Sequence, residues 1–151
     1  MTVAGPDTPT AERAFGPISR TDIVRYAGAG GDFNPIHHDE EFATAAGYPA
    51  VFAHGLLTAG ILSTFAAGWL GLERLRRFSV RYVDQVWPGD TLVTRGEVVE
   101  TVESADGLEV TARLTVHVTG EHGAGPRLVL TGQATAAYPG TELTGAGDGR
   151  D

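Results

Sequence analysis

The segment that decides the fold is Gly55–Leu70, which reads GLLTAGILSTFAAGWL. It contains no charged side chain, and its apolar residues surround the predicted helix instead of forming one stripe. Other parts of the chain must therefore cover nearly every face of this helix. The wider stretch 47–72 also lacks charged residues, and its length would suffice for a membrane span. Because it carries five glycines together with Pro49 and His54, we interpret it as a buried helix.

Alternating apolar and polar residues dominate the second half of the chain. Four long segments show the alternation that is typical of half-buried strands: 78–84, 91–103, 108–119 and 128–138. The Ala-Asp-Gly sequence at 105–107 indicates a hairpin turn. A shorter strand near 12–18 brings the number to five. We therefore predict an α+β fold, in which a five-stranded antiparallel sheet wraps around the central buried helix.

Two shorter helices are expected before the central one. Ser19 is an N-cap candidate, and the acidic Asp22 three residues later completes a capping-box pattern for a helix over 19–26. The glycines from Gly28 onward are expected to end that helix. A second helix is expected over Asp39–Ala46, with acidic residues near its positive end.

Length and composition limit the classes of protein. The 151 residues suit one domain, which we place at 11–139 between flexible tails at 1–10 and 140–151. The chain has no cysteine and no lysine, which excludes disulfides, thiolate nucleophiles and Schiff-base lysines. A net charge of −8 argues against a nucleic-acid partner. The N-terminus lacks the basic start and apolar run of a secretory signal, so we expect a cytoplasmic protein without membrane insertion.

The densest group of reactive side chains lies at 31–39, in the sequence GDFNPIHHD. Asp32 and His37 are five residues apart, and Pro35 stiffens the segment between them. A carboxylate and an imidazole held by one loop can perform general acid/base catalysis on a small substrate. The alternative is an ordinary turn, in which these residues are polar surface groups before a helix.

A second feature follows at the start of the central helix. The amides of a helix N-terminus can bind a negative oxygen, and Gly55 would let a ligand approach closely. His54 and Gly55 are therefore candidates for an oxyanion or substrate-binding site. Ser63 lies about two turns further along and could face the same side. Its alternative role is a hydrogen bond back to the preceding helical turn.

Two further groups of residues have competing interpretations. Four arginines lie within eight residues and could bind a CoA phosphate or an acidic carrier protein, or could form a solvated helix end: Arg74, Arg76, Arg77 and Arg81. A metal site is the less favoured interpretation of His37, His38, Asp39 and His54. Adjacent histidines rarely point the same way, and no H-E-x-x-H pattern occurs. We expect no metal and no redox cofactor.

The loop and helix motifs together resemble a known family. The sequences Gly31-Asp-Phe-Asn-Pro-Ile-His37 and Ala53-His-Gly-Leu56 are similar to those of MaoC-like (R)-specific enoyl-thioester hydratases, which have the hotdog fold. The stretch 26–39 resembles most the catalytic subunit of bacterial (3R)-hydroxyacyl-ACP dehydratases. The resemblance implies that two subunits join their sheets edge to edge, as a homodimer or as a heterodimer with a related hotdog subunit.

The resemblance also implies roles for individual residues. Asp32 and His37 would be the catalytic pair, and Asn34 would hold their loop or a water molecule. The Gly55 amide would bind the thioester oxygen, with Ser63 supporting the site. The expected reaction interconverts (3R)-3-hydroxyacyl and trans-2-enoyl thioesters of CoA or acyl carrier protein. A hotdog thioesterase and a non-catalytic partner subunit are the alternatives.

Overall fold

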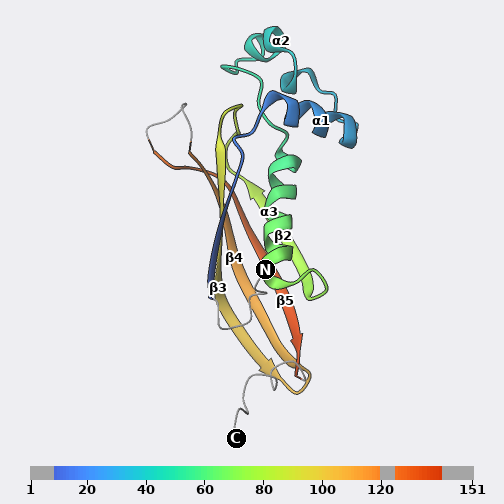
Figure 1. The fold of residues 1–151 in the computed structure, drawn as a ribbon, viewed down its shortest axis with the longest axis vertical. Coiled ribbons are helices and arrows are strands. Elements are labelled where there is room, and N and C mark those ends of the chain that lie inside the picture. The colour runs from blue at the N-terminus through green and yellow to red at the C-terminus, as the bar shows by residue number, and fades with distance from the viewer. Residues whose placement is uncertain (1–8, 120–124, 141–151) are drawn as a thin grey trace, which may run out of the picture.

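The computed structural model describes residues 9–119 and 125–140 (Figure 1). Nine elements follow one another in the order β1(Thr10–Phe15), α1(Arg20–Gly30), η1(Pro35–His37), α2(Glu40–Ala45), α3(Gly55–Leu70), β2(Leu75–Tyr82), β3(Thr91–Ser104), β4(Gly107–Thr119) and β5(Arg127–Pro139). The expected tails, 1–10 and 140–151, lie almost wholly outside the described residues. Pro9 and Thr10 are the exceptions at the N-terminal end, since the Pro9 carbonyl accepts from the Val98 amide and Thr10 begins β1.

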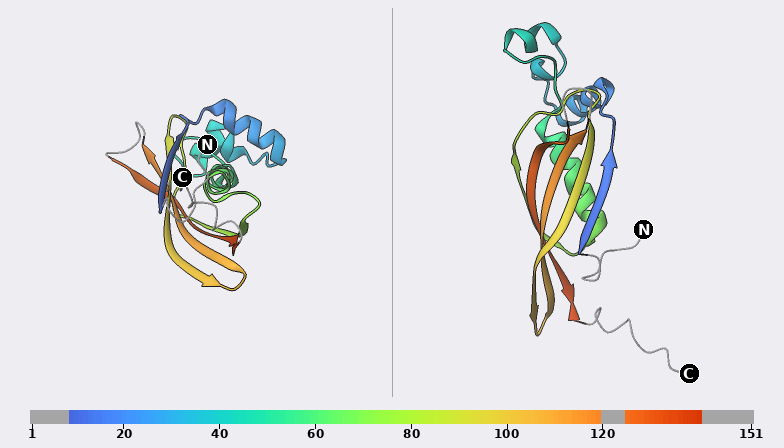
Figure 2. Two further views of the ribbon diagram at one scale, coloured as in Figure 1. Left: turned by 60° about the horizontal axis from the view of Figure 1, so that its bottom comes forward. Right: turned by 90° about the vertical axis from the view of Figure 1, so that its left-hand side faces the viewer.

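The five strands form one antiparallel sheet, as the alternation predicted. Their spatial order is β1-β3-β4-β5-β2, so β1 and β2 are the two edges. Bulges interrupt the register of β3 between Val98 and Glu100 and of β2 between Leu75 and Arg77. The sheet curves around α3, which lies along its concave face (Figures 1 and 2).

Helix α3 has the bounds that its sequence predicted, Gly55–Leu70. Alternate residues of β4 face it, from Leu108 to Val118, and each of them is buried. The helix packs most closely at Gly96 of β3, where an added Cβ would lie 2.2 Å from Cζ3 of Trp69. Gly96 therefore makes room in the sheet for the Trp69 ring. Burial of this helix and its facing strand side chains is the main source of stability.

Three expected boundaries are wrong. Helix α1 runs through Gly28 to Gly30 and ends at Gly31, whose φ of 69° lies in the left-handed region. A glycine inside a helix costs only about 1 kcal/mol, so Gly28 does not stop it. Strand β1 lies two to three residues earlier than 12–18, and β2 begins at Leu75 instead of residue 78. Both are edge strands, where pairing on one side alone leaves a weaker pattern in the sequence.

The N-terminal capping predictions are confirmed. The Ser19 hydroxyl accepts a hydrogen bond from the Asp22 amide at 3.1 Å, and the Asp22 carboxylate accepts one from the Ser19 amide at 2.9 Å. Asp39 caps α2 by accepting from the Phe42 amide. Among residues 9–119 and 125–140, no helix combines the length and apolar character that crossing a bilayer requires.

Arg127 fixes the connection from β2 to β3, which passes close to the start of α3. Its guanidinium pairs with Asp84 at 2.7 Å and with the buried Asp90 at 3.3 Å, and donates to the Gln85 carbonyl at 2.8 Å. Burial raises the pKa of Asp84, but its hydrogen bonds from Arg127 and the Gln85 amide and the Arg127 charge outweigh this and hold the pKa below its usual range. The connection is therefore well fixed beside the helix N-terminus.

Candidate active site

The loop from Gly31 to Asp39 lies at the end of the molecule where α3 begins (Figure 1). Asn34 is the N-cap of η1, and its side-chain oxygen accepts from the Ile36 amide at 3.3 Å. The Asn34 amide donates to the Asp32 carboxylate at 3.3 Å. Asn34 thus holds the loop in shape, which is one of the two roles expected of it.

His37 is positioned as a base. It is buried, and its Nδ1 lies 2.8 Å from the Phe52 carbonyl oxygen. A carbonyl can only accept, so Nδ1 carries the hydrogen and Nε2 keeps its lone pair. Burial lowers the pKa of His37 most, the hydrogen bond to Phe52 opposes this, and the His54 ring lowers it further. The imidazole therefore holds its proton less tightly than an exposed histidine.

The fold brings Asp32 and His37 together and adds His54 to them. One nitrogen or carboxylate oxygen from each of the three residues lies within 4.8 Å of the other two. The His37 and His54 rings are 3.8 Å apart between centroids and tilted by 31°. The Asp32 side chain is about half exposed (52%), whereas His54 is almost fully buried. An exposed carboxylate thus stands beside a buried imidazole, as acid/base catalysis at a solvent-facing site requires.

The residues that meet in the structure are not the four that the sequence offered as metal ligands. His38 donates from Nε2 to the Phe33 carbonyl at 3.1 Å and Asp39 caps α2, so neither is directed at a common point with His37. The compact trio instead contains Asp32. His54 presents an N–H to it, because its Nε2 lies 3.0 Å from the Asp32 carbonyl oxygen. The donor set therefore favours proton chemistry over metal ligation.

Gly55 begins α3, and the N-cap His54 makes no side-chain capping bond. The Leu57 amide donates to the His54 carbonyl at 3.1 Å, but within the described residues the Gly55 and Leu56 amides have no acceptor and are available for a ligand. A Cβ on Gly55 would lie 2.9 Å from Cε1 of Tyr82, the last residue of β2. A larger residue at position 55 would therefore displace the half-exposed Tyr82 ring, a contact that spacing along the sequence did not indicate.

A cavity of about 240 Å³ opens beside Gly55. Its lining includes Phe52, Thr58, Tyr82 and Asp84. Asp32 and His37 are not among its lining residues, so this cavity does not by itself connect Gly55 with Asp32 and His37. Phe52 connects the two places, since it lines the cavity and its ring packs edge-on against His37 at 5.1 Å.

Ser63 is not brought to the catalytic pair. Its hydroxyl donates to the Gly60 carbonyl at 2.9 Å, one turn back along α3. This is the alternative that the sequence left open for it. In the described residues, no hydrogen bond joins Ser63 to Asp32, His37 or Gly55.

The four arginines occupy two kinds of position. Arg74 pairs with Glu73 at 3.2 Å and packs over the Tyr138 ring, and Arg76 donates to the Glu73 carbonyl. Both lie beyond the C-terminus of α3, about 24 Å along the helix from Gly55. Arg76, Arg77 and Arg81 are all exposed on β2, which returns along α3 until Tyr82 meets Gly55. Of these four arginines, Arg81 is therefore the one nearest to Gly55 along the chain.

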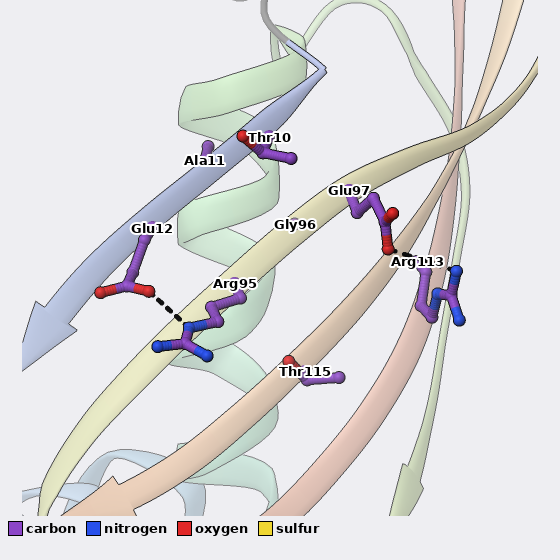
Figure 3. A pocket seen from close by; sticks show the side chains of 8 residues that line it. All are labelled: Thr10, Ala11, Glu12, Arg95, Gly96, Glu97, Arg113 and Thr115. Atoms are coloured by element: carbon purple, nitrogen blue, oxygen red, sulfur yellow. Dashed lines mark hydrogen bonds and ion pairs between the residues drawn. The ribbon is translucent and has the colours of Figure 1, made fainter.

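A larger depression of about 390 Å³ lies on the outer face of the sheet (Figure 3). Two ion pairs cross it: Glu12 of β1 with Arg95 of β3, and Glu97 of β3 with Arg113 of β4 at 3.2 Å. These side chains are exposed and paired, and they come from the face opposite α3. The arrangement stabilises strand pairing modestly and contains no group suited to catalysis.

Comparison with known proteins identifies the family of the chain. The model of the MaoC like domain matches residues 2–120. The chain is 35% identical to the 3-hydroxybutyryl-CoA dehydratase of Methylorubrum extorquens, over 83% of this chain and 76% of that protein. It is 33% identical to the (R)-specific enoyl-CoA hydratase of Rhodospirillum rubrum, over 81% of each. It also matches the fatty acid synthase beta subunit pkiC of Emericella nidulans, but spans only 6% of that protein.

Solved structures show the same architecture. An R-hydratase from Pseudomonas aeruginosa superposes with a TM-score of 0.68 at 25% identity, covering 92% of this chain and 83% of the other. The ChsH1–ChsH2 complex from Mycobacterium tuberculosis gives 0.69 at 25% identity, covering 91% of this chain and all (100%) of the matched one. The five-stranded sheet around α3 is thus the hotdog fold. The chain belongs to the MaoC-like family.

Proposed function

We propose that this protein is an (R)-specific hydratase/dehydratase, a carbon–oxygen lyase that interconverts (3R)-3-hydroxyacyl and trans-2-enoyl thioesters. The observation that carries the proposal is the meeting of Asp32 with the free Nε2 of His37 near the uncapped N-terminus of α3. Similarity over about four fifths of the chain to an (R)-specific enoyl-CoA hydratase and a 3-hydroxybutyryl-CoA dehydratase supports it. The proposed reaction requires neither a metal nor a redox cofactor.

In the proposed mechanism, Asp32 and His37 divide the proton transfers between them. In dehydration, Nε2 of His37 takes the C2 proton, and the resulting enolate oxygen is stabilised by the Gly55 amide. The C2 electron pair then forms the C2=C3 bond as the C3–O bond breaks. Asp32, in its acid form, gives its proton to the departing hydroxyl, which leaves as water. A proton passing from His37 back to Asp32 restores the pair, and hydration follows the reverse path.

The substrate carrier and the assembly are part of the proposal. Arg77 and Arg81 could receive the phosphates of CoA or the acidic surface of an acyl carrier protein, with Arg74 and Arg76 further away. A second hotdog subunit, identical or related, would pair with a sheet edge; the similarity to a chain of the ChsH1–ChsH2 complex supports a related partner. The site of action would be the cytoplasm.

The decisive experiment uses the purified chain with crotonyl-CoA. We expect reversible loss of the enoyl absorbance, formation of the 3R alcohol and no release of free thiol. Free thiol release without change at C2=C3 would instead identify a thioesterase. Turnover that appears only when a second hotdog subunit is added would identify a heterodimer, and absence of hydration with both CoA and carrier-protein substrates would reject the proposal.

A further inference from the structure

His54 is a buried histidine that has no part in the proton transfers described above. It is only 2% exposed and lies between two rings, Tyr26 of α1 at 5.1 Å and His37 at 3.8 Å. As the N-cap of α3 it does not cap the helix with its side chain. Packing between two rings would be served equally well by an apolar side chain, so packing does not explain an imidazole here.

The hydrogen bonds of His54 show what the imidazole adds. Its Nε2 lies 3.0 Å from the backbone carbonyl oxygen of Asp32. Because a carbonyl only accepts, Nε2 carries the hydrogen, and Nδ1 is left as a bare acceptor. That Nδ1 is buried and finds no partner within the described parts of the chain. Burying the unpaired Nδ1 destabilises the fold. The hydrogen bond from Nε2 to Asp32 is therefore the interaction that distinguishes this imidazole from an apolar side chain.

This bond comes from outside the catalytic loop. The other bonds near Asp32 are local: the Asn34 amide to the Asp32 carboxylate at 3.3 Å, and His38 Nε2 to the Phe33 carbonyl at 3.1 Å. Both involve exposed groups of the loop itself, and the loop's other bond to a distant segment, from His37 Nδ1 to the Phe52 carbonyl, lies five residues beyond Asp32. His54 ties the Asp32 backbone to the first turn of the core helix, across 22 residues of sequence.

His54 lies next to the other two groups of the proposed site, so its bond to Asp32 relates all three to one another. The next residue is Gly55, whose amide would bind the thioester oxygen, and the His54 ring lies against the His37 ring. The His54 ring thus contacts His37 and bonds the backbone of Asp32, and the His54 backbone is joined by a peptide bond to the Gly55 amide.

We propose that His54 is a positioning residue, which uses its Nε2–H···O=C bond to Asp32 to hold the loop carboxylate in register with His37 and the Gly55 amide. The inference rests on the proposed function for its kinetic consequence only. Loss of such registration by about 1 Å lowers turnover by about 10²-fold while leaving substrate binding largely intact.

Three substitutions separate positioning from packing. His54→Gln keeps an N–H donor at about the reach of Nε2, His54→Asn has a shorter amide that cannot reach Asp32, and His54→Leu keeps apolar bulk without a donor. We expect kcat to fall by about 10- to 100-fold in the Leu and Asn variants, with KM changed less than about threefold. The Gln variant should recover most of the loss. Equal kcat in the Gln and Leu variants, with both folded by circular dichroism, would overturn the proposal.

A second measurement does not depend on any activity. Long-range ¹H–¹⁵N spectra of the histidine rings should show the Nε2–H tautomer for His54 and the Nδ1–H tautomer for His37. Heteronuclear NOE values for the amides of 32–34 should fall in His54→Leu and stay near the wild type in His54→Gln. A His54 ring with hydrogen on Nδ1 would refute the proposal. If His54 carries its hydrogen on Nε2 but the protein hydrates no thioester, the proposed function is rejected while the positioning of Asp32 by His54 stands.

Discussion

The helix α3 and the loop 31–39 are built on opposite principles. In α3 seven of the 16 residues are buried, and the order comes from apolar packing inside the curved sheet. The loop is mostly exposed, and its order comes from local features. Gly31 lies in the left-handed region, and the side chains of Asn34 and Asp39 accept hydrogen bonds as helix caps. Stability and reactivity are thus assigned to different regions, which meet at His54 and Gly55. Substitutions should separate the two properties.

The largest effect is expected from the catalytic pair. Asp32→Asn and His37→Ala should each lower kcat for crotonyl-CoA hydration by about 10²-fold or more, since each removes one proton-transfer group. The exposed Asp32→Asn should leave the free energy of unfolding within about 0.5 kcal/mol of the wild type. Asp106→Asn, at the exposed β3–β4 turn, is the matched control and should keep full activity. Near-wild-type turnover in either catalytic variant contradicts the assignment.

The reverse separation is expected in the core. Leu62 is fully buried on α3, and Leu62→Ala should lower the free energy of unfolding by about 2–5 kcal/mol through lost burial and a cavity. The kcat of the fraction that stays folded should change little. Urea denaturation followed by circular dichroism measures the loss. Leu72→Ala, at a leucine that is 75% exposed, is the control, and an equal loss there would show that burial on α3 is not what stabilises the fold.

His37 connects the two regions through pH. Burial lowers its pKa, so the base form should persist below the ordinary value near ~6.5, and the acid limb of kcat/KM should lie below that value. The lowered pKa of His37 should also make the free energy of unfolding depend on pH. The unfolded imidazole binds a proton more readily than the folded one, so the free energy of unfolding should fall as pH drops through the ordinary value toward the folded pKa. Urea titrations of wild type and His37→Gln at several pH values test this, and an identical pH dependence in both would contradict it.

The smallest effect is expected from the exposed arginines. Arg77→Gln combined with Arg81→Gln should raise KM for an acyl-CoA by about threefold to tenfold at low salt, since two exposed charges contribute modestly. The difference should shrink at about 0.5 M salt, where the screening length is only a few ångströms. Arg113→Gln on the outer face of the sheet is the control. A KM that is unchanged at low salt would remove these arginines from the binding surface.

The sequence predicted the two regions unequally. A charge-free, all-round apolar segment has few ways to exist in water, so Gly55–Leu70 was predicted to the residue. The long strands alternate because one face meets α3, and their pairing into an antiparallel sheet followed. The edge strands β1 and β2 were displaced by two or three residues, because one-sided pairing constrains their side chains less.

The site was predicted as a set of residues but not as an arrangement. The closeness of Asp32 to His37 could be expected from five-residue spacing across Pro35. The tautomer of His37, the turn of the His54 side chain toward Asp32 and the Tyr82 ring over Gly55 depend on contacts between distant segments. No local pattern encodes such contacts. Ser63 shows the converse, since helical phase put it on a plausible face while its own helix supplied a nearer acceptor.

The fit of the Trp69 ring over Gly96 limits how this layer of the protein can vary during evolution. A methyl group at Gly96 has no space while the indole is present, and a smaller residue at Trp69 leaves a hollow that glycine cannot fill. A library that changes one position at a time would score both as intolerant. A paired change, such as Gly96→Ala with Trp69→Leu, removes both problems at once. The two positions should therefore change together in evolution or stay as they are.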